Sequence, residues 1–149
     1  MSYKPFQYLK CSSAGITTTN TQSKLPLTED ESGSLFTVSG DTVTINGDGV
    51  YAINATVQVQ STVQRLQATL KVFVNGVYDG VERGGSYIRN AGTSHDFWSM
   101  NFYTLKTLSS NDTIEFYISA VQGASYDGTS SLNYSVNSTG NEFIIERRQ

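Results

Sequence analysis

Residues 42–59, TVTINGDGVYAINATVQV, contain two runs of alternating apolar and polar residues on either side of a short acidic turn. In the first run Val43 and Ile45 share one face. In the second run one face carries only apolar side chains, those of Tyr51, Ile53, Ala55, Val57 and Val59. A period of two is typical of strands with one buried face. Residues 47–49, Gly-Asp-Gly, tolerate the positive φ angles of tight turns. The stretch therefore predicts a β-hairpin within an antiparallel sheet.

The composition of the whole chain also favours short strands and turns. Its 149 residues suffice for one domain with a substantial core. Only 38% of them are hydrophobic and 15% charged, so the surface must rely on Ser, Thr, Asn and Gly. Thr and Tyr favour strands, whereas Gly and Asn favour turns. No helical period of useful length occurs, and many short strands separated by turns predict an all-β antiparallel sandwich or jelly roll.

Other strands follow the same alternation. Residues 65–75 place apolar side chains at every second position, and Asn75-Gly76 is the strongest two-residue hairpin signal in the chain. Residues 113–121 and 142–147 are predicted to form two further strands. Residues 14–34, in contrast, indicate a loop or weak edge strands, with a solvated acidic patch at 28–31.

Charge and cysteine content exclude several classes of function. The net charge of −3 and the pI near 5.0 argue against a general nucleic-acid-binding protein. A single cysteine, Cys11, excludes an intrachain disulfide, and we expect it to be a small buried hydrophobe in the first strand. The N-terminus lacks a signal-peptide pattern and no run reaches transmembrane length, so we expect synthesis in a cytoplasm and no membrane insertion.

Signs of catalytic or metal chemistry are weak. The candidate acid–base groups are His95, Asp96, Asp48 and Asp127. Sequence neighbours on a strand point to opposite faces, and no nucleophilic serine motif, His cluster or paired carboxylate accompanies them. Calcium could use oxygen ligands from acidic turns at Asp41, Asp48 and Asp112, but EF-hand-like spacing is missing. We expect neither an enzyme nor a bound metal or cofactor.

Residues 36–51, FTVSGDTVTINGDGVY, resemble the first strands of the C1q/TNF-like jelly roll, in which a short strand and turn lead into a long core strand. Similar motifs follow in the same order: LKVFVNG at 70–76, Tyr-Ile-Arg at 87–89, LSSNDTIEFYIS at 108–119 and an apolar strand at 143–145. The resemblance spans residues 6–147. It implies a homotrimer used for binding or as a structural cap rather than for catalysis.

The resemblance also implies a trimer interface. In this superfamily the sheet with the third, sixth and last long strands faces the threefold axis, which corresponds here to residues 65–75, 113–121 and 142–147. One large apolar side chain interrupts the polar outward face of each strand, as a packed interface requires. Lys71 could pair with Glu115 or Glu142 across subunits. The predicted interface residues are Phe73, Tyr117, Ile144, Lys71 and Glu115.

Chains of this type without a signal peptide or collagen-like stem resemble bacteriophage virion proteins. The resemblance implies a non-enzymatic capsid decoration protein (head fibre or cement protein) on the virion surface, bound to the major capsid protein or another virion protein. An N-terminal arm, residues 1–10, leads into the jelly-roll domain at 6–149. The residues of the arm predicted to dock on the capsid are Tyr3, Lys4, Pro5 and Phe6.

Two alternatives remain open at this stage: a receptor- or glycan-binding knob of a phage fibre, and a bacterial C1q-like adhesion module. Exposed loop aromatics usually contact glycans, and by type Tyr78, Tyr87, Trp98 and Tyr126 qualify. Tyr126 is the one most expected to be exposed. Trp98 is expected in the core because Met100 and Phe102 follow it at a period of two.

Overall fold

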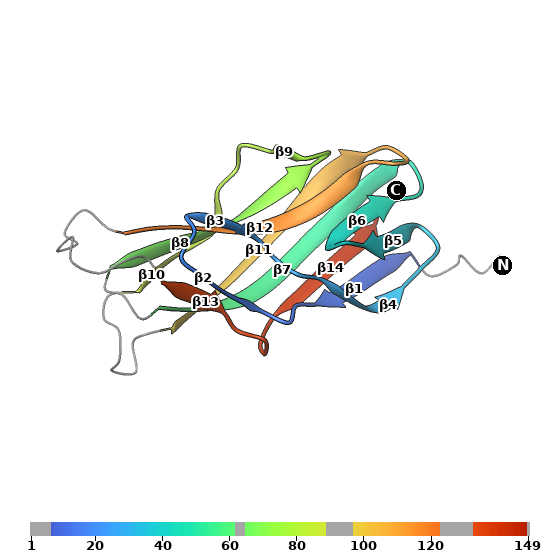
Figure 1. The fold of residues 1–149 in the computed structure, drawn as a ribbon. Helices are drawn as coiled ribbons and strands as arrows, with labels where there is room; N and C mark the ends of the chain where they lie inside the picture. The colour runs from blue at the N-terminus through green and yellow to red at the C-terminus, as the bar shows by residue number, and fades with distance from the viewer. Residues whose placement is uncertain (1–6, 62–64, 89–96, 123–132, 149) are drawn as a thin grey trace.

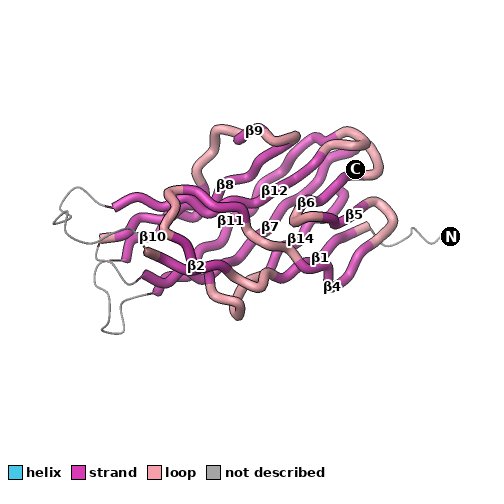
Figure 2. Tube along the Cα trace, in the orientation of Figure 1, coloured by secondary structure: helices cyan, strands magenta, loops and turns pink. Residues whose placement is uncertain are grey.

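The computed structural model describes residues 7–61, 65–88, 97–122 and 133–148. Within these ranges the chain forms fourteen strands and no helix, and the strands build two layers (Figure 1). Loops gather mainly at the two ends of the layers (Figure 2). No helix of the described residues is long and apolar enough to span a membrane. The predicted all-β antiparallel sandwich is confirmed.

The first layer, sheet A, is organised around its longest strand. Its strands are β1 (Tyr8–Ser12), β2 (Ile16–Thr18), β4 (Thr28–Ser32), β7 (Gly49–Ser61), β11 (Phe97–Leu108), β13 (Tyr134–Val136) and β14 (Glu142–Arg147). β11 pairs with β7 along its whole length, while β13 and β14 pair with the opposite side of β7. β1 lies between β14 and β4.

The second layer, sheet B, is organised around β8 and β12. Its strands are β3 (Gln22–Lys24), β5 (Phe36–Ser39), β6 (Thr42–Ile45), β8 (Leu66–Val74), β9 (Val77–Tyr78), β10 (Arg83–Ile88) and β12 (Thr113–Gln122). The strand order is β10-β8-β12-β6-β5, with β9 added to β8 and β3 added to β12. All pairs in both sheets are antiparallel.

The inward faces of the two sheets enclose one hydrophobic core. Aromatic pairs join the layers: the ring centroids of Phe116 on β12 and Phe143 on β14 lie 4.8 Å apart, and those of Phe36 and Tyr51 lie 5.9 Å apart. Such pairs add to the stabilisation that comes from burying the rings. Cys11 is buried with this core, as predicted.

The hairpin predicted for residues 42–59 is wrong, although both of its strands exist. β6 pairs with β5 and β12 in sheet B, whereas β7 lies in sheet A. The connection between them therefore crosses from one layer to the other. Alternation shows which side of a strand is buried, but two strands facing the same core from opposite sheets have the same pattern.

Two other turns are the true hairpins. Gly40 and Asp41 join β5 to β6 with φ of 60° and 62°, and Asn75 and Gly76 join β8 to β9 with φ of 52° and 76°. Positive φ at both central residues is the requirement of tight hairpin turns. The hairpin predicted at Asn75-Gly76 is confirmed.

The segment at 14–34 forms short strands at sheet margins. β2 and β4 end the path of sheet A, and β3 adds to β12. Residues 28–31, in β4, are exposed, which agrees with the prediction of a solvated acidic patch.

Candidate functional site

Three carboxylates in acidic turns accept hydrogen bonds from backbone amides, two of them from other segments of the chain. Asp41 accepts a hydrogen bond from the Leu27 amide at 3.0 Å, and Asp48 accepts one from the Ser110 amide at 2.8 Å. Asp112 accepts from the Asn75 side chain and the Ser109 amide, both at 2.8 Å, and these bonds lower its pKa. No three His, Cys, Asp or Glu side chains within the described ranges are placed to share a metal ion. These carboxylates stabilise turns.

Several candidates lie outside the described residues. They are Tyr3, Lys4, Pro5 and Phe6 of the N-terminal arm, His95, Asp96, and the loop residues Tyr126 and Asp127. Their predicted roles stay predictions.

The thiol of Cys11 is chemically protected. Burial raises its pKa to about 12, with further contributions from the charges of Asp30 and Glu29 on β4. Because the thiolate is the nucleophile, a thiol that stays protonated at neutral pH is inert. Cys11 is part of the hydrophobic core.

Three rings lie together on the outer face of sheet B, and we call them the aromatic platform: Phe73, Tyr78 and Tyr117. The ring centroids of Phe73 and Tyr117 are 4.2 Å apart, and those of Phe73 and Tyr78 are 5.7 Å apart. Phe73 faces Tyr78 across the β8–β9 pair, and Tyr117 on β12 lies diagonally from it. All three rings are partly buried, so each shows part of its surface on the sheet.

Charged side chains flank the platform, but Lys71 and Glu115 do not pair with each other. The Lys71 ammonium lies 4.8 Å from the centre of the Tyr78 ring and 3.4 Å from the Gln22 side-chain oxygen. Glu115 forms an ion pair with Lys24 at 2.7 Å. The charges predicted to bridge subunits thus have partners within the chain.

Ile144 is not near the aromatic platform. It lies on β14, in sheet A, and its outward side chain is on the opposite side of the sandwich from Phe73 and Tyr117. The expectation that one sheet carries all three residues is therefore wrong. The last strand pairs with β7 and β1, and nothing in its alternation could show which sheet it joins.

A second surface, which the sequence analysis missed, lies around Ile144. On β11 the side chains of Phe97, Tyr103 and Leu105 point outward and are 52%, 57% and 54% exposed. Tyr103 is opposite Asn54 on β7, which is in turn opposite Ile144 on β14. We call Phe97, Tyr103, Leu105 and Ile144 the outer apolar face of sheet A. The outward residues at 97, 103 and 105 are apolar in the sequence, but so are the inward residues at 98, 100 and 102. The alternation therefore could not show which side of this strand is exposed.

Trp98 departs from its prediction. It shares the inward side of β11 with buried Met100, yet 51% of its surface is exposed. It is the second residue of β11, at the start of the strand.

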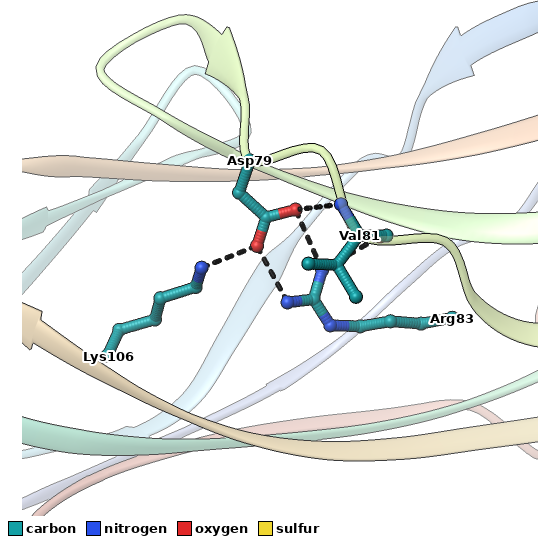
Figure 3. Close-up of polar contacts among 4 residues, drawn as sticks. All are labelled: Asp79, Val81, Arg83 and Lys106. Atoms are coloured by element: carbon teal, nitrogen blue, oxygen red, sulfur yellow. Dashed lines mark hydrogen bonds and ion pairs between the residues drawn. The ribbon is translucent and has the colours of Figure 1, made fainter.

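An ion-pair cluster joins the two sheets at one margin. Asp79 accepts hydrogen bonds from Arg83 at 2.6 and 2.9 Å, from Lys106 at 2.6 Å and from the Val81 amide at 3.1 Å (Figure 3). Arg83 belongs to β10 of sheet B and Lys106 to β11 of sheet A. The side chains of Asp79 and Arg83 are only 6% and 7% exposed.

The electrostatics of Asp79 follow from these contacts. Burial by itself raises the pKa of a carboxylate, but hydrogen bonds from Arg83, Lys106 and Val81 and the charge of Arg83 outweigh it and lower the pKa to about 2. The Arg83 guanidinium also lies 5.3 Å from the centre of the Phe102 ring, a favourable cation–π distance. A carboxylate held so firmly in its charged form connects strands and is a poor proton acceptor.

Solved structures show the same arrangement of strands. Murine APRIL at pH 5.0 superposes with a TM-score of 0.67 at 14% sequence identity, over 97% of this chain and 99% of that chain. Eiger TNF from S. frugiperda superposes with a TM-score of 0.63 at 9% identity, over 98% of this chain and 94% of that chain.

The fold is a TNF-like jelly roll. The jelly-roll expectation from the sequence is confirmed. No family model and no curated protein sequence matches the chain. At these identities the likeness extends to the fold alone, so function has to be argued from the surfaces described above.

Proposed function

We propose that this protein is a non-enzymatic structural protein that assembles as a homotrimer through the outer apolar face of sheet A. The observation that carries the assembly is β11, where Phe97, Tyr103 and Leu105 are each more than half exposed. Exposed apolar side chains mark interaction sites, and aromatic residues are enriched in interfaces. On the same face of sheet A the exposed Asn54 of β7 lies between Tyr103 and the partly buried Ile144 of β14.

A second copy of the chain is the occupant we propose for this face. The C1q/TNF-like resemblance supports a trimer, and the rim of the face carries charges of both signs. Lys10 and Glu142 form an exposed ion pair at 3.8 Å beside Ile144, and Glu146 lies two residues further along β14. An apolar centre with a charged rim is the usual composition of a protein interface.

We further propose that the trimer decorates a bacteriophage head as a head fibre or cement protein. The resemblance to virion proteins and the surface rich in neutral polar residues support this role. The partner is then the major capsid protein or another virion protein, with the N-terminal arm as the attachment segment and the capsid surface as the location.

Two measurements test the proposal. Light scattering at micromolar concentration should give three times the chain mass of 16.3 kDa. Electron microscopy of the native particle should then show threefold projections on the capsid surface. A monomeric mass would refute the assembly. A trimer that is located only at the tip of a tail fibre would refute the decoration role while leaving the assembly intact.

A further inference from the structure

The aromatic platform on sheet B takes no part in the proposed assembly. The outer apolar face belongs to sheet A, so the two surfaces lie on opposite sides of the sandwich and can be occupied at the same time. The three rings gather at one end of the outward face of β8 and β12, next to the polar pair Thr69 and Ser119, with exposed Val121 one pair further along.

A small cavity with a mainly polar lining lies next to the platform on sheet B: the rings do not line it, but Lys71, which is opposite Tyr117, does. Its volume is about 190 Å³, and its walls include Gln67, Thr69 and Lys71 of β8, Glu82, and Ser119 of β12. Pockets for drug-sized ligands measure about 300 to 1,000 Å³, so this cavity suits a single small ring. Its walls offer amide, hydroxyl, ammonium and carboxylate groups, both donors and acceptors of hydrogen bonds.

The hydroxyl of Tyr78 lacks a partner. It is shielded from solvent and makes no hydrogen bond to any described residue. Burial raises the pKa of this hydroxyl, with contributions from the charges of Glu82 and Asp79. A buried polar group without a partner carries a free-energy cost.

We propose that the aromatic platform and its cavity bind a neutral hexopyranose unit of an oligosaccharide. One face of a pyranose ring presents C–H groups that pack on an aromatic ring, here Tyr117, which lies opposite the cavity residue Lys71, while its rim carries hydroxyls. Those hydroxyls would bond to Lys71, Glu82 and Ser119 at the cavity. Because Lys71 and Glu82 have opposite charges, the site offers no net preference for an anionic or cationic ligand.

Other classes of ligand fit less well. An extended peptide would need a free strand edge, but β8 and β12 each have neighbours on both sides at the platform, and β9, which pairs only with β8, is two residues long. A cation would compete with Lys71, whose ammonium already lies over the Tyr78 ring. A saccharide needs neither a free edge nor a vacant cation position.

The test uses lactose, maltotriose and cellotriose as ligands of the full-length protein, with binding measured by saturation-transfer NMR. We expect the wild-type protein to transfer saturation to the ring protons of at least one of them. Tyr117→Thr should weaken that binding at least about tenfold, since it removes one stacking surface. Trp98→Thr removes an exposed aromatic side chain of β11 that belongs to neither surface, and it should bind as the wild type does.

Circular dichroism melting establishes that each variant is folded. If Tyr117→Thr does not fold, Lys71→Thr replaces it, with the same expected loss. Absence of transfer to all three sugars would overturn the proposal, as would wild-type affinity in the platform variant. A change in the mass of folded Tyr117→Thr would also overturn it, because the platform would then be an interface between copies. Failure of trimer assembly in the wild type affects only the proposed function.

Discussion

Arg83 and Asp79 form a bidentate ion pair at the margin between the two sheets, with Nη1–Oδ1 and Nη2–Oδ2 distances of 2.9 and 2.6 Å. Lys106 brings a second cation to the same carboxylate from the other sheet. The described part of the jelly roll has no disulfide, and this cluster connects β10 to β11 through ion pairs. Bidentate geometry also restricts the orientation of both side chains.

Asp79→Ala should destabilise the protein by about 3 to 5 kcal/mol, because it leaves the buried Arg83 charge uncompensated. Urea unfolding at pH 7 measures the change. Glu29→Ala, an exposed carboxylate on β4, is the matched control and should change the free energy of unfolding by no more than about 0.5 kcal/mol. A loss below about 1 kcal/mol for Asp79→Ala would show that the cluster contributes little.

Acid should weaken the same cluster. The pKa of Asp79 is 3.8 without the fold and about 2 within it, so its charge stabilises the folded state above pH 3.8. This contribution of about 2 kcal/mol is lost as the pH falls from about 5 to 2. Unfolding free energies measured at several pH values should therefore fall more steeply in this window for the wild type than for Asp79→Asn. Equal slopes would contradict the lowered pKa.

Cys11 should resist thiol reagents in the folded protein. Its pKa of about 12, against an ordinary value of 9.0, lowers the thiolate fraction at pH 8 about a thousandfold, and burial blocks access as well. Labelling with a chromogenic disulfide should be negligible in buffer and complete in denaturing urea. Rapid labelling of the native protein would show that β1 and β4 separate readily.

The alternation of residues was sufficient to predict strands and their buried sides. The alternating apolar residues of 51–59 and 66–72 are in the core, as their pattern predicts. The prediction succeeds because the alternation of buried and exposed side chains is a local property of one strand and does not depend on its pairing partners. Asn75-Gly76 was equally predictable, since the requirement for positive φ is local.

The assignment of strands to sheets was not predictable in the same way. β6 and β7 are adjacent in sequence but lie in different layers, and β14 pairs with β7 rather than with β8 or β12. The sheet that each strand joins is determined by packing between residues that are far apart in the chain. The error about Ile144 has the same cause. Arg83 is four residues from Asp79 in the sequence, but Lys106 joins the cluster because β10 and β11 meet at one margin, so this second cation could not be associated with Asp79 from sequence spacing.

Removal of residues 2–5 should abolish attachment to empty phage heads and leave the trimer intact. β1 begins at Tyr8 and pairs with β14 from that residue onward, so the deletion removes none of its strand pairing. Co-sedimentation with empty heads measures attachment, and light scattering measures the assembly. Substituting residues 2–5 with Gly and Ser at unchanged length is the control that separates side-chain contacts from arm length. Binding retained after the deletion would exclude the arm as the docking segment.

Leu105→Glu should convert the trimer to a monomer. Leu105 is 54% exposed on β11, beside Tyr103, so a carboxylate there can stay hydrated in the monomer but would have to be buried unpaired in an interface. Light scattering at micromolar concentration should then give 16.3 kDa. Gln67→Glu makes the same charge change at an exposed position on sheet B and should keep the trimer mass, because that sheet faces away from the proposed interface. If Gln67→Glu dissociated the assembly and Leu105→Glu did not, sheet B and its aromatic platform would be the surface that joins the subunits.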